Sequence, residues 1–391
     1  MSEQRATKLN QVKHVETWQE EVIFSDGDAF FENLITAITS ASKSISIEKY
    51  IFDPDVLGKK VLSALSAAAD RGVKVRLLLD GAGCSEWDFK DAQKSRKKNF
   101  EIRFFHPMPW QRKYSRLWSY VNVNKMVRGF SLLNHRDHRK ICLIDDDLAF
   151  IGSMNVSARH LKSLVHEAAW RDTSVRVRGE KIQVLHESFE EVWNFFNNYV
   201  LRYLQRKKMT SGLPLLMLNR TREERRIYNR SILHRVLSAH TRVWITNPYF
   251  LPTLRLRKVI RIAARKGVDM VMLFPSKSDF FGVKLAMESH YHFLLKSGVK
   301  LYEYQPSMIH AKILITDDRV MMGTSNLNSR SLLHDLEVDV EITHLDNIQL
   351  VTSQFSQDLL QAKRIEFAEW KKRSWVRRIL EGVFFWFRLV L

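Results

Sequence analysis

Two stretches of the chain carry the same reactive side chains at the same spacing. The first is His138-Arg139-Lys140 with Asp145 after four further residues, and the second is His310-Ala311-Lys312 with Asp317 after four. Each copy then reaches a glycine and an asparagine, as Gly152-Ser153-Met154-Asn155 and Gly323-Thr324-Ser325-Asn326. One such pattern could arise by chance in a chain rich in lysine and aspartate. Two copies with matched continuations indicate an internal duplication.

An imidazole beside an ammonium group is suited to the chemistry of a phosphodiester. The four residues between lysine and aspartate, Ile-Cys-Leu-Ile in one copy and Ile-Leu-Ile-Thr in the other, predict a buried strand. Because alternate residues of a strand share a face, we expect His138 beside Lys140 and His310 beside Lys312. The lysines can neutralise the phosphoryl oxygens as charge grows in the transition state. A histidine can attack phosphorus or transfer a proton near neutral pH.

Four further polar residues are expected to return to the same patch. Segments 148–151 and 319–322 predict second strands, so each copy is expected to form a hairpin closed by an acidic pair. The following glycines then turn the chain and bring back Ser153, Asn155, Thr324 and Asn326. If the two copies pair about a pseudo-two-fold axis, one centre holds two histidines, two lysines and two asparagines. The sequence has neither H-E-x-x-H nor paired C-x-x-C motifs, so we expect no metal and no cofactor.

The doubled motif resembles the signature of the phospholipase D superfamily, H-x-K-x4-D followed by G-[GS]-x-N. Within it the chain most resembles bacterial cardiolipin synthases of the shorter kind, without amino-terminal membrane helices. That likeness extends to segments 47–52, 68–75 and 247–250. The second copy departs from the pattern, with five rather than six residues between Asp317 and Gly323 and with Thr324 in place of Gly or Ser.

The resemblance implies a covalent phosphohistidine route. His138, in the amino-terminal motif, would be the nucleophile, and His310 would act first as general acid and then as base. The resemblance also implies that a downstream carboxylate orients each motif histidine. The matching positions are Asp172 and Glu337.

The reaction implied is transfer of a phosphatidyl group from one phospholipid, phosphatidylglycerol, to a headgroup hydroxyl of a second, with release of the headgroup alcohol. Water as the acceptor would give a phospholipase D, and serine would give a phosphatidylserine synthase. A nuclease is the rival class that the positive net charge favours. A non-catalytic lipid-binding scaffold is a third hypothesis, which the two intact His-Lys pairs argue against.

Helices alternate with apolar strands in both halves, which predicts an α/β fold. Helix-like segments 54–71 and 253–266 each lead into a strand, 73–79 and 268–274, and the first helix is expected to begin at Asp53-Pro54. We therefore expect two phospholipase D-like domains related by a pseudo-two-fold axis, each a mixed sheet flanked by helices, with one shared active site. Their bounds are 1–208 and 209–370, with the joint near 206–212, followed by a tail at 371–391.

Composition indicates an anionic partner. Lys and Arg total 62 against 43 Asp and Glu, a net charge of +19. The two cysteines exclude a disulfide framework, and Cys142 is predicted to be buried in a motif strand. The start of the chain lacks a signal-peptide pattern, and no run approaches the roughly 20 apolar residues of a membrane span. We expect a peripheral protein at the cytoplasmic face of a bacterial inner membrane, acting on anionic phospholipid and not on nucleic acid; the oligomeric state stays open.

Two segments are candidates for membrane contact. An insertion near 106–134 interleaves basic residues with Trp and Tyr, for which an ordinary surface loop is the alternative. The tail, from Lys371, is predicted to form an amphipathic helix that lies in the membrane interface, although docking on its own domain is the alternative. Its expected apolar face is Trp375, Val376, Ile379, Leu380, Val383, Phe384, Trp386, Phe387, Val390 and Leu391. Arg222–Arg226 is predicted to be a solvated face, and His290 and His292 are predicted to be structural.

Overall fold

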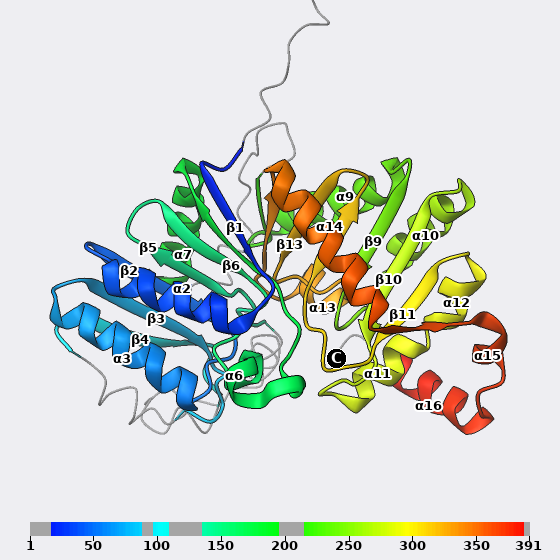
Figure 1. The fold of residues 1–391 in the computed structure, drawn as a ribbon, viewed down its shortest axis with the longest axis horizontal. Coiled ribbons are helices and arrows are strands. Elements are labelled where there is room, and N and C mark those ends of the chain that lie inside the picture. The colour runs from blue at the N-terminus through cyan, green and yellow to red at the C-terminus, as the bar shows by residue number, and fades with distance from the viewer. Residues whose placement is uncertain (1–16, 88–96, 109–134, 195–214, 387–391) are drawn as a thin grey trace, which may run out of the picture.

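The structure, a computed structural model, describes residues 17–87, 97–108, 135–194 and 215–386 (Figure 1). The expected domain joint near 206–212 lies outside the described residues. So does most of the basic and aromatic insertion, together with the last five residues of the tail.

Two β-sheets repeat one topology. The first has the order β1 (Glu20–Phe24), β7 (Ser174–Arg178), β6 (Leu148–Gly152), β5 (Ile141–Ile144), β2 (Ser44–Lys49), β3 (Lys74–Asp80), β4 (Phe100–Phe105). The second has β8 (Leu216–Leu218), β14 (Val338–Ile342), β13 (Arg319–Gly323), β12 (Ile313–Thr316), β9 (Arg242–Thr246), β10 (Asp269–Pro275), β11 (Lys300–Tyr304) and then β15 (Ala362–Ile365). Only β2-β3-β4 and β9-β10-β11 run parallel. The predicted duplication of a mixed sheet is confirmed.

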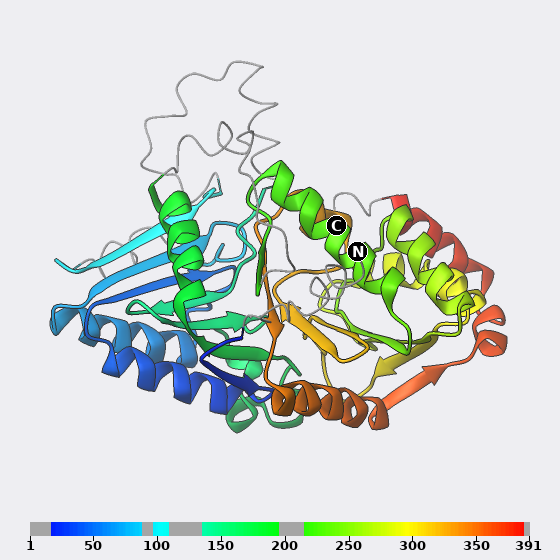
Figure 2. The same cartoon turned by 90° about the horizontal axis from the view of Figure 1, so that it is seen from above.

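Helices cover both sheets. The long ones are α2 (Gly27–Ser40), α3 (Val56–Asp70), α7 (Gln183–Asn194), α9 (Arg222–Ser238), α10 (Leu254–Arg265) and α14 (Leu345–Leu360). The short ones are α6 (Lys162–Val165), α11 (Phe281–Glu288), α12 (Tyr291–Lys296), α13 (Ser329–Leu333), α15 (Phe367–Lys371) and 3-10 turns at Ala158–His160, His166–Ala168 and Glu180–Ile182. Figure 2 shows α2, α3 and α14 on one side of the molecule and α9 and α10 on the other.

Three hydrophobic cores hold these layers together. One joins α2 and α3 to the first sheet, and another joins α9 to α12 to the second sheet. The third is shared, because strands β5 to β7 and β12 to β14 bury side chains in it beside α7 and α14. The two halves therefore pack through a common apolar core, and this fixes how their motif strands meet.

The predicted hairpins are confirmed at both motifs. Strand β5 pairs with β6, and β12 pairs with β13, both antiparallel. Asp145 and Asp317 take the left-handed conformation at the two turns, with φ of 52° and 54°. Helix α3 begins at Val56 rather than at Asp53-Pro54, because the side chain of Asp55 caps it by accepting the Gly58 N–H at 2.9 Å.

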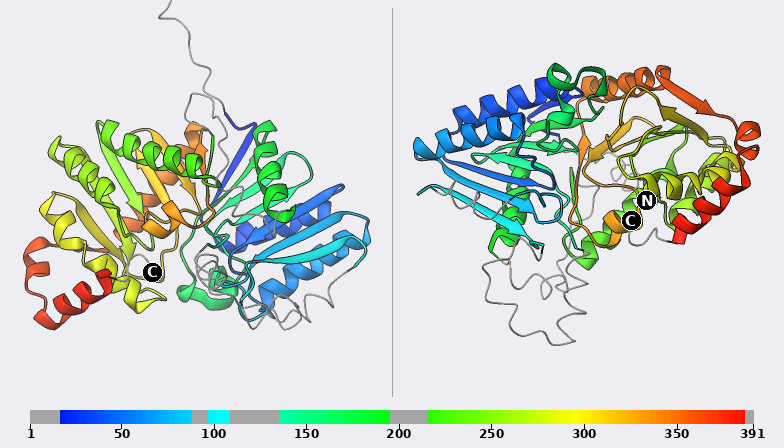
Figure 3. Two further views of the ribbon diagram at one scale, coloured as in Figure 1. Left: turned by 180° about the vertical axis from the view of Figure 1, so that it is seen from behind. Right: turned by 90° about the horizontal axis from the view of Figure 1, so that it is seen from below.

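The tail forms helix α16 (Trp375–Trp386), which packs on α11 at the far end of the second half (Figure 3). Its docked side is not the expected apolar face. Arg377 pairs with Glu288 of α11 at 2.7 Å, and buried Glu381 pairs with Arg373 at 2.8 Å. Trp375, Ile379 and Val383 are 72%, 54% and 47% exposed. In the described part of the chain, no helix combines the length and apolarity needed to cross a membrane.

One glycine permits this docking. A Cβ on Gly282 of α11 would lie 2.6 Å from the ring of Phe384, an apolar residue that α16 turns toward its own domain. The prediction that the helix has two unlike faces is confirmed. The assignment of Phe384 to the same face as Trp375, Ile379 and Val383 is wrong, because Phe384 packs against the core of its own domain on the side where Arg377 pairs with Glu288.

Candidate active site

The two motifs meet where the halves of the molecule join. The N–H of His138 donates to the Leu336 carbonyl at 3.0 Å, and the N–H of His310 donates to the Arg171 carbonyl at 2.8 Å. Asp137 and Leu336 form a parallel bridge, as do Arg171 and Ile309. Each motif is therefore held by the segment that precedes the carboxylate of the other copy.

Each motif histidine is hydrogen-bonded to a carboxylate from the other half of the molecule. His138 Nδ1 lies 2.9 Å from Glu337 Oε1, and His310 Nδ1 lies 2.8 Å from Asp172 Oδ2. All four side chains are buried. With Nδ1 held by a carboxylate, the Nε2 atom of each ring is left to act on a substrate. The structure thus brings together four of the candidate residues as two crossed pairs.

The residue after each motif glycine has a hydroxyl group that is hydrogen-bonded to one of the carboxylates. The Ser153 hydroxyl donates to Asp172, and the Thr324 hydroxyl donates to Glu337. A Cβ at the preceding glycines would lie 2.4 Å from the Ser174 Cα and 2.3 Å from the Val338 carbonyl oxygen. The glycines therefore allow β7 and β14 to approach closely enough for these contacts. The departure from the family pattern at Thr324 keeps the hydroxyl that makes the bond.

Two motif lysines and a third lysine lie beside the histidines. Lys140 Nζ donates to the His138 carbonyl at 2.7 Å, and Lys312 Nζ lies 3.1 Å from His310 Nε2. Burial lowers the pKa of Lys140 to about 7, and Lys312 adds to this, while burial lowers the pKa of Lys312 to about 8. Lys49, which the sequence did not single out, is also buried, and burial lowers its pKa. A phosphodiester anion bound here would favour the charged form of all three.

Both imidazoles are neutral near pH 7. Burial lowers the pKa of His138 well below its usual value, and the charges of Lys140 and Lys312 lower it further. Burial, followed by the charge of Lys312, also lowers the pKa of His310, although Asp172 opposes the change. A neutral ring whose Nδ1–H donates to a carboxylate has a lone pair on Nε2, as a nucleophile or a general base requires.

The two carboxylates differ in their charge. Burial raises the pKa of Glu337 to about 7, and Lys140 only partly offsets this. Burial would also raise the pKa of Asp172, but His310, His160 and Lys312 together lower it below its usual value. Asp172 is therefore firmly anionic and can stabilise an imidazolium at His310. Glu337 provides weaker support of that kind to His138.

The two motif asparagines are buried and are held differently. Asn155 Oδ1 accepts the Ile51 N–H at 3.3 Å. Asn326 Oδ1 is buried and has no hydrogen-bond partner among the residues described. Because a buried amide oxygen without a partner is costly, the Asn326 amide is a candidate contact for a bound ligand.

The motif aspartates do not belong to the cluster. Asp145 accepts the backbone N–H groups of Ser42, Lys43 and Ser44, and Asp317 accepts those of His240, Thr241 and Arg242. A strand separates each from its lysine, and five residues at about 3.3 Å each span roughly 16 Å. Their place in the motif suggested a catalytic role. Their contacts instead fix the turn that enters β2 or β9.

Four aromatic residues at the cluster were missed by sequence reasoning. The ring of Tyr50 lies 4.8 Å from that of His138, while Trp170 and Tyr249 lie 5.3 Å and 6.1 Å from His310. His160, also buried, lies 3.8 Å from Asp172. Tyr50 and Tyr249 follow the carboxyl ends of β2 and β9, a position that could have pointed to them. The described residues contain no group of three or more His, Cys, Asp or Glu placed to hold a metal.

Comparisons with known proteins match both halves of the chain. A family model described as "Cardiolipin synthase, PLD-like domain" matches residues 34–193 and 232–359, so that each match spans one half. The chain is 28% identical over 367 residues to the probable cardiolipin synthase YwiE of Bacillus subtilis. It is 30% identical over 369 residues to a cardiolipin synthase of Halalkalibacterium halodurans. Both alignments cover 92% of this chain and 70% of the relative.

The fold is also similar to solved structures. A phosphatidylserine synthase of Haemophilus influenzae superposes with a TM-score of 0.66 at 14% identity and covers 100% of this chain and 99% of its own. A polyphosphate kinase of Porphyromonas gingivalis gives a TM-score of 0.57 at 14% identity, covering 90% of this chain and 49% of its own. At this level of identity the likeness concerns the fold alone.

Proposed function

The chain belongs to the cardiolipin synthase family with a phospholipase D-like domain, and from this membership we propose that it transfers a phosphatidyl group between phospholipids. The donor is phosphatidylglycerol, and the acceptor is a headgroup hydroxyl of a second phosphatidylglycerol. The products are cardiolipin and glycerol. The observation that carries the proposal is the pair of crossed histidine–carboxylate contacts in one buried cluster.

In the first step His138 Nε2 attacks phosphorus and a phosphorus–nitrogen bond forms. The bond from phosphorus to the glycerol oxygen breaks, and that oxygen takes a proton from His310 Nε2. The anionic state of Asp172 beside His310, in contrast to the raised pKa of Glu337 beside His138, supports this division of roles. The negative charge of the bound phosphodiester offsets the lysines and raises the pKa of His310, so that its Nε2 takes up a proton from solvent before this step. The proton that His310 gives to the glycerol oxygen is replaced in the second step by that of the acceptor hydroxyl.

In the second step the acceptor hydroxyl attacks phosphorus and gives its proton to His310. The phosphorus–nitrogen bond to His138 breaks and the neutral imidazole is restored. Lys140, Lys312 and Asn326 surround the phosphoryl oxygens, where charge grows in both transition states. Water or serine as acceptor would use the same two steps. The residues that bind the acceptor headgroup, and not the histidines, therefore determine which acceptor reacts.

We further propose that the protein acts while bound to the cytoplasmic face of a membrane as a peripheral protein. Helix α16 supports this, because it directs Trp375, Ile379 and Val383 to solvent while its charged side docks on α11. Exposed apolar side chains on a helix with a basic lead-in suit the interface of an anionic leaflet.

The test is incubation with radiolabelled phosphatidylglycerol in detergent micelles and, in parallel, with labelled single-stranded DNA. Formation of cardiolipin and glycerol in equal amounts is the expected result. Phosphatidic acid as the main product would indicate a hydrolase, and phosphatidylserine formed only on addition of serine would indicate a phosphatidylserine synthase. Cleavage of the DNA with no change in the lipid would overturn the proposal.

A further inference from the structure

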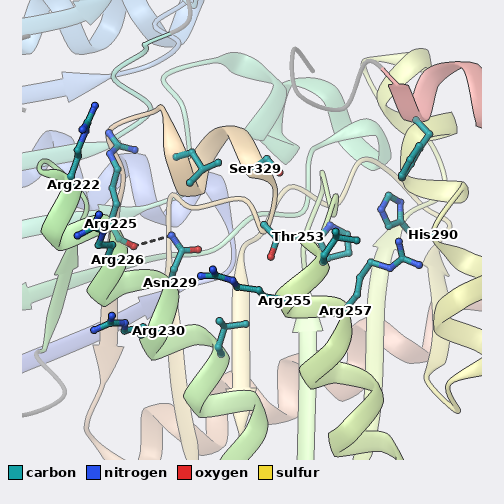
Figure 4. A pocket seen from close by; sticks show the side chains of 15 residues that line it. Arg222, Arg225, Arg226, Asn229, Arg230, Thr253, Arg255, Arg257, His290 and Ser329 are labelled. Atoms are coloured by element: carbon teal, nitrogen blue, oxygen red, sulfur yellow. Dashed lines mark hydrogen bonds between the residues drawn. The ribbon is translucent and has the colours of Figure 1, made fainter.

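A cationic groove lies on the second half and is lined by residues outside the catalytic cluster. It has a volume of about 760 Å³ and is lined by residues of α9, α10 and α13 (Figure 4). Phe385 of α16 also belongs to the lining. Its lining combines arginines with apolar residues such as Leu254 and Leu333. None of the catalytic-cluster residues lines it.

The charged side chains that line the groove are all positive. Its described lining holds no carboxylate and six arginines: Arg222, Arg225, Arg226, Arg230, Arg255 and Arg257. Arg225 is committed to the carbonyls of Asp335 and His334, at 2.9 and 3.0 Å. Arg226, Arg230 and Arg255 are exposed, and within the described ranges none of the three forms an ion pair. Three guanidinium groups are thus available to one anionic ligand, and such groups bind phosphate oxygens in a bidentate manner.

The fold does not require Arg226, Arg230 and Arg255. By strand order, α9 and α10 are the counterparts of α2 and α3 in the first half. Helix α9 holds five arginines and α2 holds no basic residue, while α10 holds five basic residues and α3 holds two. Arg225 and Arg235 of α9 are buried in structural contacts. The same helix pair packs on the same type of sheet in the first half without the remaining charge, which indicates that the exposed Arg226, Arg230 and Arg255 have a purpose other than folding.

The apolar part of the groove points to a lipid. Leu254 is 78% exposed and Leu333 is 45% exposed, so the groove offers apolar contacts beside its cations. Phe385 connects the groove to α16, whose Trp375, Ile379 and Val383 also face solvent. We propose that the groove binds the phosphodiester headgroup of an anionic phospholipid as a second lipid site. The arginines bind the phosphate, and the leucines and α16 contact the upper acyl chains.

This site is separate from the catalytic cluster but adjoins it through α13. Ser329 and Leu333 of that helix line the groove. Arg330, between them, pairs with Asp335 at 3.1 Å, and its charge lowers the pKa of His138. The inference goes beyond the proposed reaction and does not depend on it, since it concerns binding and can be measured without turnover.

The experiment compares two triple variants of the full chain that lose the same charge. The groove variant is Arg226→Gln/Arg230→Gln/Arg255→Gln. The control is Lys258→Gln/Arg261→Gln/Arg265→Gln, which changes exposed residues of α10 outside the groove. In sedimentation with phosphatidylcholine vesicles that contain phosphatidylglycerol, we expect the groove variant to lose about tenfold or more in affinity and the control about threefold or less. Equal losses of vesicle affinity in the two variants would overturn the proposal, because they would show that the net charge of the protein, and not the groove, governs binding.

Two competitors identify the ligand. Dihexanoyl phosphatidylglycerol, dissolved as monomers, should displace the wild-type protein from these vesicles, whereas inorganic phosphate at the same concentration should not. Equal competition by inorganic phosphate would make the groove a site for a free anion. A groove variant that keeps its vesicle binding but loses binding to single-stranded DNA would assign the groove to nucleic acid. Either result would contradict the lipid site, whatever reaction the catalytic cluster performs.

Discussion

His138 is hydrogen-bonded through Nδ1 to Glu337, a carboxylate 199 residues further along the chain and in the opposite half of the molecule. The pair of His310 with Asp172 spans 138 residues in the same crossed manner. Each motif histidine therefore takes its carboxylate from the opposite half. The catalytic cluster is a property of the packed halves, and each half depends on the other for the orientation of its imidazole.

The first prediction is that the two motifs form one site. His138→Ala and His310→Ala should each lower turnover by at least about 10³-fold, because each histidine performs a step that the other cannot replace. The assay is cardiolipin formation from labelled phosphatidylglycerol in micelles, with far-UV circular dichroism to show that the variants fold. His292→Ala, an exposed histidine on α12, is the matched control and should stay close to wild type. Retention of half the activity in either motif variant would mean two independent sites.

The second prediction concerns the covalent intermediate. A phosphatidyl ester with p-nitrophenol as leaving group needs no general acid, so His310→Ala should release one equivalent of p-nitrophenol in a burst and then stall. The phosphatidyl group should be found by mass spectrometry on the peptide that contains His138. The reciprocal variant, His138→Ala, should show neither burst nor adduct. An adduct on His310 in that variant would reverse the two roles.

The third prediction follows from the raised pKa of Glu337, about 7 in the folded protein. Between the usual pKa of a glutamate and this value, the folded state binds more protons than the unfolded state, so this group makes stability fall as pH rises through that window. In the wild-type protein this group should lower the free energy of unfolding by up to about 3 kcal/mol between about pH 4.5 and 7. Glu337→Gln should remove this decrease. Urea denaturation at several pH values measures it. An unchanged slope would mean that Glu337 titrates normally.

The fourth prediction separates the motif aspartates from catalysis. Asp317→Asn keeps a side chain that tolerates the left-handed turn but removes the charge that accepts three backbone N–H groups. We expect a loss of about 1–3 kcal/mol in the free energy of unfolding, with kcat within about threefold of wild type. Because the pKa of Asp317 is lowered in the folded protein, its contribution to the free energy of unfolding is present near neutral pH and is lost as the pH falls through that pKa. A loss of kcat as large as that of the histidine variants would return Asp317 to the catalytic set.

The spacing within each motif was sufficient to predict the hairpins and the neighbouring histidine and lysine, because these depend on local strand geometry. The pairing of each motif histidine with Glu337 or Asp172 of the opposite half could not be predicted from spacing, since it depends on how the two sheets pack around a shared core. The amphipathic character of α16 was predicted, but its rotation was not. Periodicity shows that a helix has two faces, and here the contact of Arg377 with Glu288 decides which one docks.

The last prediction tests whether the exposed face of α16 lies in the membrane interface. Trp375→Ser/Ile379→Ser/Val383→Ser should lower vesicle affinity about tenfold or more, because burial of each side chain contributes roughly 1–2 kcal/mol. Activity in micelles should change little, since the docked face with Arg377 and Glu381 is intact. High salt should weaken wild-type binding only in part, because the apolar contribution is not screened. The matched control is Leu345→Ser/Leu350→Ser/Leu360→Ser, three similarly exposed apolar residues on α14, which lies on the other side of the molecule (Figure 2). Equal losses in both variants would show that exposed apolar area in general, and not α16, governs binding.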